Sequence, residues 1–177
     1  MDNVQIKPSF WAMNAGAIIG FGMVVIDFLG YMYVEQTSQA MGLINLIIYA
    51  GFFAGIFISQ KLFRDRVREG ELRYDQALGI GLLTSMYASI IIGFYYYVLF
   101  TYDRELLGKM IEAVQQMYQQ NGFSGKMMED ARKVSTPVTM GFSYVFNFTV
   151  IGLMASFVTS LLVKKTTIQN KKTDTNQ

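Results

Sequence analysis

The stretch WAMNAGAIIGFGMVVIDFLGYMY, residues 11–33, decides the fold class. It carries a single charged residue, Asp27, and as a helix rising about 1.5 Å per residue it can cross a hydrocarbon core of roughly 30 Å. Three further apolar stretches of this kind follow, at residues 41–60, 77–100 and 138–163. In lipid, only a helix makes all of its backbone hydrogen bonds within one segment. The sequence therefore predicts an all-α fold, a bundle of four transmembrane helices.

The composition supports a membrane protein without enzymatic chemistry. Of the 177 residues, 52 % are apolar and only 16 % are charged, whereas about a quarter of a soluble domain is charged. The chain has no histidine and no cysteine, which removes the commonest metal ligands and every thiol nucleophile. Phosphate-binding glycine motifs and paired carboxylates are also absent. We therefore expect no catalytic residue, no metal site and no cofactor.

Residues 102–135 form the longest connection between the predicted spans. Apolar residues in its first part recur at the i, i+3, i+4 and i+7 spacing of an amphipathic helix. Asn121-Gly122 is a helix stop signal, and a shorter amphipathic segment follows it. Thr136-Pro137 then combines an N-cap with proline at the first helical position, which starts the last span. The pattern predicts an amphipathic helical hairpin between the third and fourth spans.

Four methionines of this hairpin form an adaptable apolar surface: Met110, Met117, Met127 and Met128. Methionine is flexible and polarisable, so such a surface suits a partner protein or the lipid interface. Two amphipathic helices can also bury each other's apolar faces. Both interpretations are open at the level of sequence.

The stretch RDRVREG at residues 64–70, followed by YDQALGIGLLT at residues 74–84, resembles the central motif of a bacterial family of unknown function, DUF4199. In that family a charged, glycine-containing turn leads into a small-residue third span. A long amphipathic insert and a last span started by proline follow. The resemblance implies a four-span protein of the inner membrane of Bacteroidota-type bacteria. It implies no catalytic residue.

Basic residues predict the orientation of the chain. Residues 61–76 carry five lysines and arginines and residues 164–177 carry four, whereas residues 34–40 carry none. Short loops rich in lysine and arginine stay in the cytoplasm. We therefore expect both termini in the cytoplasm and the hairpin outside it. Residues 1–165 should form one transmembrane domain, and residues 166–177 should be a disordered cytoplasmic tail.

Small residues recur at four-residue intervals in every predicted span, which lets helix backbones approach closely in lipid. The four stripes are Ala12, Gly16 and Gly20; Gly51, Gly55 and Ser59; Gly81, Ser85 and Ser89; and Gly152, Ser156 and Ser160. On the predicted topology all four stripes lie in the cytoplasmic half. We expect tight packing there and a wider outer half, in which Phe94, the tyrosines at 95–97 and Phe146 supply bulk. These tyrosines and Tyr31 also lie near span ends, where aromatic rings prefer the headgroup level. A face for homo-oligomers is the alternative.

Asp27 is the one ionisable residue well inside a span. A carboxylate at a helix centre costs about 2.5 to 3.5 kcal/mol on the insertion scale. It lies close to two turns after Gly20, so we expect it to face the bundle interior, with Asn45 and Asn147 as candidate hydrogen-bond partners. It could bind a proton or cation, contact a partner subunit, or only fix helix packing.

Two classes of function follow from these features. We expect a non-enzymatic accessory or scaffold subunit that acts through association with a membrane protein. The alternative is a small oligomeric transporter or channel with a proton or cation site at Asp27. Acidic residues interleave with the basic residues of the second connection, which indicates a solvated turn and no nucleic-acid surface.

Overall fold

The computed structural model describes residues 7–34, 39–120, 122 and 125–165. These residues form six helices and no strand. The helices are α1 (Pro8–Tyr33), α2 (Gln39–Val67), α3 (Tyr74–Tyr102), α4 (Arg104–Gln120), α5 (Gly125–Val134) and α6 (Pro137–Val163). The all-α prediction is confirmed.

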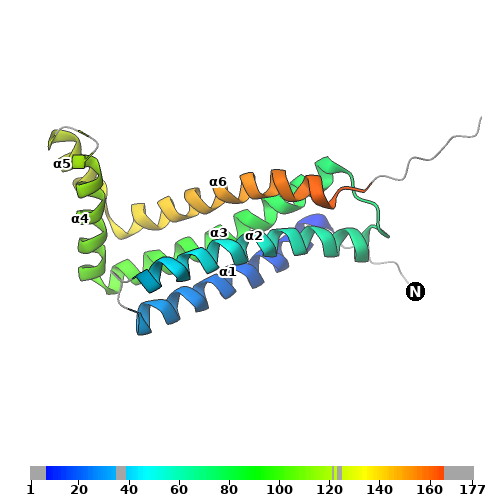
Figure 1. Ribbon diagram of the computed structural model, residues 1–177, viewed down its shortest axis with the longest axis horizontal. Helices are drawn as coiled ribbons and strands as arrows, with labels where there is room; N and C mark the ends of the chain where they lie inside the picture. The colour runs from blue at the N-terminus through cyan, green and yellow to red at the C-terminus, as the bar shows by residue number, and fades with distance from the viewer. Residues whose placement is uncertain (1–6, 35–38, 121, 123–124, 166–177) are drawn as a thin grey trace, which may run out of the picture.

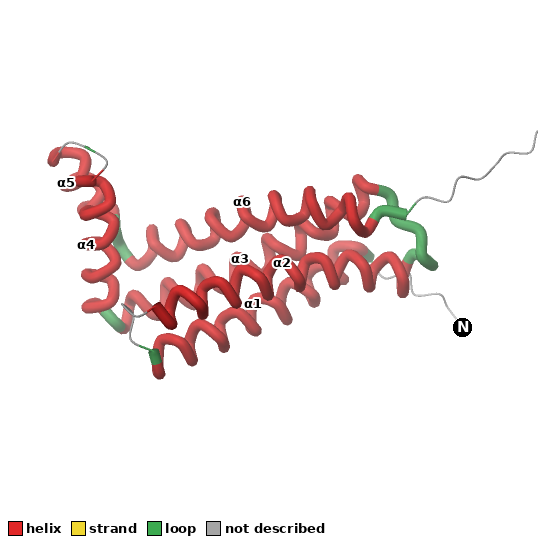
Figure 2. The backbone as a smooth tube through the Cα atoms, viewed as in Figure 1, coloured by secondary structure: helices red, strands yellow, loops and turns green. Residues whose placement is uncertain are grey.

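Four of these helices, α1, α2, α3 and α6, lie side by side as one elongated bundle, and α4 and α5 stand across one end of it (Figure 1). All four are long and apolar enough to cross a membrane. The chain is therefore a multi-pass integral membrane protein. We call the end with α4 and α5 the α4 end. The opposite end, where α1 begins, α6 finishes and α2 turns into α3, is the turn end (Figure 2).

The helix bounds differ from the apolar stretches most clearly at α2. Apolarity ends near Gln60, but the helix continues to Val67, because backbone hydrogen bonds do not require an apolar side chain. Arg64 and Arg66 lie in its last turn, where positive charge is favoured by the helix dipole. Gly70, with a φ of 90°, follows and permits the sharp turn into α3.

Two proline residues each occupy the first turn of a helix. Pro8 begins α1, and Pro137 begins α6 after the N-cap Thr136. The Thr136 hydroxyl accepts a hydrogen bond from the Thr139 backbone N–H at 3.2 Å, which confirms the predicted cap. Gly122, with a φ of 75°, lies beyond the end of α4 as the stop signal predicts, whereas Asn121 is outside the described residues.

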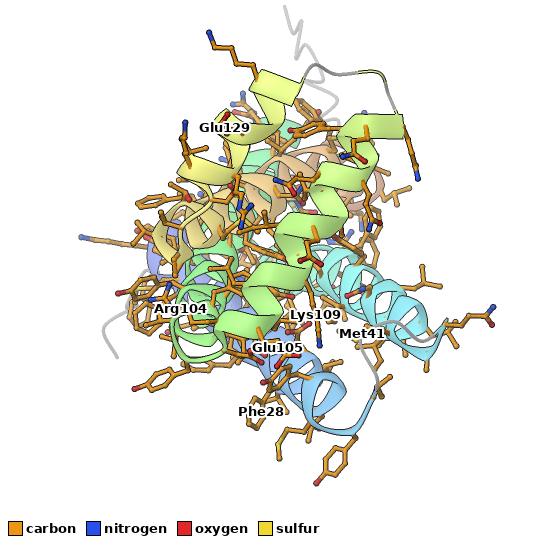
Figure 3. All side chains as sticks on the ribbon, turned by 90° about the vertical axis from the view of Figure 1, so that its left-hand side faces the viewer. Phe28, Met41, Arg104, Glu105, Lys109 and Glu129 are labelled. Atoms are coloured by element: carbon orange, nitrogen blue, oxygen red, sulfur yellow. The ribbon has the colours of Figure 1, made fainter. Side chains whose placement is uncertain are left out.

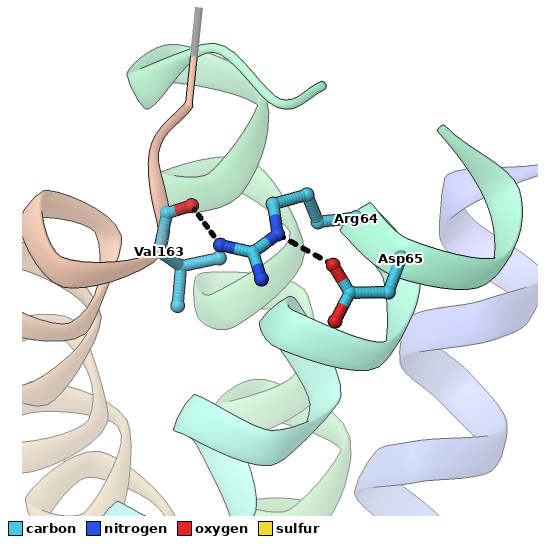
Figure 4. Close-up of polar contacts among 3 residues, drawn as sticks. All are labelled: Arg64, Asp65 and Val163. Carbon is cyan, nitrogen blue, oxygen red and sulfur yellow. Dashed lines mark hydrogen bonds and ion pairs between the residues drawn. The ribbon is translucent and has the colours of Figure 1, made fainter. Parts of the chain in front are cut away.

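The turn end is closed by contacts between α2, the turn and the end of α6. The Arg64 guanidinium donates to the Val163 carbonyl at 3.0 Å and to the Asp65 carboxylate at 2.7 Å (Figure 4). The backbones of Leu72 and Lys165 exchange two hydrogen bonds of 3.0 Å each. These contacts join the C-terminal end of the last span to the α2–α3 turn. The predicted disordered tail, residues 166–177, is outside the described residues.

The central helix is α3, because half of its membrane-spanning window is buried, against 17 % of that of α2. Close backbone approach explains this burial. A methyl group added at Gly16 would lie 2.6 Å from the Thr84 carbonyl oxygen on α3, and one added at Gly20 would lie 3.1 Å from the Ala88 backbone. The small residues of α1 therefore set the spacing between α1 and α3.

Other stripe residues make comparable contacts. Gly152 of α6 lies against Ser85 of α3, Gly81 lies against Ser156, and Gly55 lies against an isoleucine of α1. Gly51 does not belong to this set. It is exposed, and a methyl group added there would meet no atom within 4 Å, so its predicted packing role is wrong. One helix cannot bury all of its sides, and this part of α2 faces outward.

Toward the α4 end, α3 and α6 stay in close contact, although the stripes predict wider spacing in this half. Gly93 of α3 and Gly141 of α6 lie against each other, and a methyl group on either would be 2.9 Å from the other's carbonyl oxygen. Phe94 and Phe146 do not fill space inside this half, since 65 % and 72 % of their surfaces are exposed. Both side chains lie on the outside of the bundle, because their neighbours in sequence, Gly93 and Val145, contact each other at the interface between α3 and α6.

Candidate polar cavity at the α4 end

Asp27 lies inside the bundle, with 2 % of its surface exposed. This is the interior position that its spacing from Gly20 predicts. The Tyr96 hydroxyl of α3 donates a hydrogen bond of 3.0 Å to Oδ1 of this carboxyl group. Burying a carboxyl group without a hydrogen-bond partner is strongly unfavourable, so this hydrogen bond explains in part why the fold tolerates Asp27 at a buried position.

Tyr95 provides a second hydroxyl close to the Asp27 carboxyl. It is buried and makes no hydrogen bond with good geometry to any residue that the structure describes. Its ring packs edge-on against that of Tyr96, with centroids 5.2 Å apart. The hydroxyls of two consecutive tyrosines of α3 thus lie close to one carboxyl group.

Asp27 lines a cavity of about 160 Å³ that is built by five helices. At about 30 Å³ per water molecule, this is space for roughly five waters. Its polar lining groups are the Asp27 carboxyl, the Asn45 amide and three tyrosine hydroxyls, and no lysine or arginine lines it. The lining residues are Asp27 and Tyr31 of α1, Met41 and Asn45 of α2, Tyr96, Leu99 and Phe100 of α3, Leu106 and Met110 of α4, and Tyr144 of α6.

Aromatic rings form one side of this cavity. Tyr96 and Tyr144 are stacked, with centroids 3.6 Å apart and an interplanar angle of 14°. Phe100 packs beside both, at 5.7 Å from Tyr96 and 6.3 Å from Tyr144. The stack joins α3 to α6 close to the contact between Gly93 and Gly141, and the hydroxyl of Tyr96 donates to Asp27.

Helix α4 forms the roof of the cavity. Figure 3 looks onto this end and shows α4 crossing the bundle, with its first turn at Arg104 and Glu105 beside the ends of α1 and α3. Leu107 of this helix is 6 % exposed, and Leu106 and Met110 line the cavity. The first half of the amphipathic helix therefore packs on the bundle.

Asp103 fixes the beginning of α4. Its carboxylate accepts hydrogen bonds from the Tyr31 hydroxyl at 2.6 Å and from the Leu106 backbone N–H at 2.9 Å. These two hydrogen bonds, led by that of Tyr31, hold the pKa of the Asp103 carboxyl below its usual value. Asp103 thus serves as a helix N-cap and as a tie between α1 and α4.

The predicted partners of Asp27 are mostly wrong. Asn45 lines the same cavity, but no hydrogen bond joins it to Asp27. Asn147 is exposed on the lipid-facing side of α6. Tyr144 and Phe148 take the interior positions, and Asn147, about 100° around the helix from Phe148, lies on the outer side of this face.

Sequence reasoning missed the tyrosines that surround this carboxyl group. Tyr96 and Tyr31 lie near the ends of apolar stretches, and this position predicts a place at the headgroup level of the membrane. One signal was present in the sequence. Tyr96 and Phe100 are four residues apart, which places them on one helix face.

A second polar layer lies toward the turn end. Gln60 is fully buried and donates to the Ala77 carbonyl at 3.0 Å and to the Ser160 hydroxyl at 3.1 Å. Its Oε1 atom has no hydrogen-bond partner among the described residues. Seven small hydroxyl residues accompany it, each at most 4 % exposed: Ser59, Thr84, Ser85, Ser89, Ser156, Thr159 and Ser160.

An apolar layer separates the two polar layers. It consists of Met23, Ile48, Phe52, Ile92 and Phe148, each at most 4 % exposed. Each of the four spanning helices contributes a residue to this layer that lies about one turn from one of its cavity-lining residues, as Met23 does relative to Asp27. No continuous polar path therefore runs through the part of the bundle that the structure describes.

The predicted methionine surface is divided. Met110 lines the cavity, so it faces the bundle and does not belong to an outer surface. Met117, two turns further along α4, is 52 % exposed. The side chains of Met127 and Met128 are outside the described residues. Of the four predicted methionines, Met117 on the far half of α4 is therefore the one that the structure describes as exposed.

Comparison with known proteins gives one match. No curated protein and no solved structure matches the chain significantly. A family model described as a protein of unknown function, DUF4199, matches residues 14–165, which include all six helices except the first residues of α1. The chain therefore belongs to the DUF4199 family of proteins of unknown function.

Proposed function

We propose that this protein is a non-enzymatic accessory or scaffold subunit that acts through association with another membrane protein. In this proposal the α4 end faces the extracytoplasmic side of a bacterial inner membrane, and both termini lie in the cytoplasm. The basic residues of the turn end support this orientation, because short loops rich in lysine and arginine stay inside.

The observation that carries the proposal is that one half of α4 packs on the bundle while the other half projects from it. Its first half is tied to the bundle through Asp103 and Leu107. Its second half continues past α6 and, with α5, projects from the bundle (Figure 1). On this half Val114 and Met117 are 36 % and 52 % exposed. A rigidly mounted helix with an accessible apolar face is suited to contact a partner.

The interior of the bundle also supports association over conduction. The layer around Phe52 and Phe148 fills the space between the polar layers with apolar side chains. A channel requires a polar or hydrated route across the membrane. A closed bundle serves instead as an anchor for the α4 end.

Affinity purification of the full-length chain from native membranes tests this proposal. The variants Val114→Glu and Met117→Glu place a charge on the exposed apolar face, and Gln116→Glu places the same charge on another side of α4. We expect a stoichiometric partner to co-purify with the unaltered protein and with Gln116→Glu, and to be lost from the first two variants. An identical set of proteins with all four chains would contradict the proposal.

The cavity around Asp27 favours a second candidate, a small oligomeric transporter with a proton or cation site at this carboxyl group. Its support is a buried ionisable group in a cavity that contains no basic side chain. Purified protein in liposomes should then move protons or cations, and Asp27→Asn should abolish the flux while leaving the protein folded. A flux that persists unchanged in Asp27→Asn would exclude this role.

A further inference from the structure

The cavity beneath α4 has an unbalanced composition. It contains one carboxyl group, that of Asp27, and no lysine or arginine among its ten lining residues. Around the start of α4, the acidic Asp103 and Glu105 are balanced by the basic Arg104 and Lys109, and Lys109 forms an ion pair of 2.8 Å with Glu105. The preference of the cavity for a positive charge therefore comes from the Asp27 carboxyl group in its lining.

The wall chemistry indicates which kind of cation fits. Na⁺, K⁺ and divalent ions require a shell of several oxygen ligands. Here the carboxyl group is accompanied by an amide and a few phenol hydroxyls, while most of the wall consists of aromatic rings, leucine side chains and two methionine thioethers. Aromatic rings and one carboxylate are the groups that recognise ammonium ions, whose carbon substituents favour an apolar wall.

We propose that this cavity binds a small organic ammonium ion, with the Asp27 carboxylate as its counter-ion. The inference rests on the second candidate function, the cation site at Asp27, and names the class of ligand for it. The volume of about 160 Å³ accommodates an ammonium group with a few carbon atoms and is larger than a bare metal ion requires.

Helix α4 controls access to this site. Leu106 and Met110 cover the cavity, and the tie between Asp103 and Tyr31 holds the helix in place. A ligand that enters from the α4 end must pass this roof. Because the walls then exclude water, the attraction between the carboxylate and the ammonium ion is stronger than in solution.

The ammonium group can come from a dissolved amine or from a lipid headgroup. A groove of about 700 Å³ lies between α1 and α3 and is lined mainly by apolar residues such as Val24, Phe28 and Val98. It shares Tyr31 and Leu99 with the cavity. Lipid chains in this groove would bring an ammonium headgroup to the same place.

Binding is measured on the full-length protein in nanodiscs of phosphatidylglycerol, with the thermal unfolding temperature as the readout. Methylammonium and tetramethylammonium chloride are the probes, and NaCl and KCl at equal concentrations are the salt controls. We expect a saturable rise in unfolding temperature with at least one ammonium probe and no comparable rise with the controls. Equal shifts with all four salts would overturn the proposal.

Three variants locate the binding site. In Asp27→Asn the apparent Kd for the probe should rise about tenfold or more, because a charge-assisted contact is lost. Met110→Trp fills the cavity from its roof and should abolish the shift while retaining the carboxylate. Asp75→Asn removes an exposed carboxylate at the turn end and should bind like the unaltered protein. A saturable shift that survives in both Asp27→Asn and Met110→Trp would refute the proposed site.

A second set of nanodiscs that also contains phosphatidylethanolamine distinguishes the source. A lipid source predicts that this lipid stabilises the unaltered protein, but not Asp27→Asn, and weakens probe binding. A dissolved source predicts probe binding that is indifferent to the lipid. Absence of both the probe effect and the lipid effect would refute the ammonium ligand. A flux in liposomes without ammonium binding would leave a cation site of another class, so the two failures are distinguishable.

Discussion

Replacing Gly16 with alanine should force α1 and α3 apart. The added methyl group would lie 2.6 Å from the Thr84 carbonyl oxygen and 2.6 Å from Cβ of Tyr87. Both atoms belong to or lie next to the α3 backbone, so no side-chain rotation can remove the clash. To reach an ordinary contact of 3.4 Å, the helices must separate locally by about 0.8 Å.

The cost of this separation follows from the packing around it. A gap of 0.5 to 1 Å removes about a quarter to a half of each attractive contact along the interface, and overpacking of this kind costs about 1 to 3 kcal/mol. Alanine is a better helix former than glycine by up to about 1 kcal/mol, which offsets part of it. We expect a net loss of about 1 to 2 kcal/mol in the free energy of unfolding.

Gly51→Ala is the matched control, because it makes the same chemical change at a position where the methyl group meets no atom within 4 Å. Thermal unfolding of both variants in the same detergent measures the difference. At about 2 to 4 °C per kcal/mol for a chain of this size, Gly16→Ala should unfold several degrees earlier and Gly51→Ala should not. Equal unfolding temperatures for the two variants would refute the assigned packing of α1 on α3.

Further predictions concern the ends and the interior of the bundle. Asp103→Ala should loosen α4, which is measured as faster amide exchange in the first turns of this helix. Because the pKa of the Asp103 carboxyl is lowered, the tie is present at neutral pH and should weaken only when the pH falls below the usual carboxyl pKa of about 3.8. Thr136→Ala should cost about 1 kcal/mol in thermal unfolding through the lost cap of α6, and an unchanged stability would contradict the cap. Gln60→Glu should destabilise the bundle by about 2 kcal/mol or more, because it places a carboxyl group at a fully buried position and removes the amide N–H groups that donate to Ala77 and Ser160, whereas wild-type stability would mean that this position is hydrated or pairs with Arg64 one turn along α2. Cysteines at Glu71 and Gln120, introduced into a chain that has none, should react with impermeant reagents from opposite sides of the membrane, and labelling of both from one side would overturn the orientation.

Local features of the chain were predictable because they depend on neighbouring residues. Hydropathy locates the four spans, since each must match the thickness of a bilayer on its own. The cap at Thr136 and the stop at Gly122 depend on a few adjacent backbone groups. Likewise the period of apolar residues in α4 describes one helix face, whatever it packs against.

The side of each helix that packs against its neighbours was less predictable. In lipid, an apolar side chain gains little by turning inward, so hydropathy does not say which face of a span is interior. Gly51 and Gly55 look alike in sequence, yet only Gly55 meets another helix. Asn147 looked like a partner for Asp27 but lies outside, while Tyr96 looked interfacial and donates the hydrogen bond.

The sequence by itself determined the number of spans, their helical form, the presence of an amphipathic pair between the last two, and the inward direction of Asp27. These properties follow from hydropathy, capping and helical periodicity, which act within one segment. Only the tertiary structure decided that α4 covers a cavity, that Tyr96 rather than an asparagine meets Asp27, and that an apolar layer divides the polar interior. Those features depend on the rotation and register of helices distant in sequence, which the close contacts of a few small residues set.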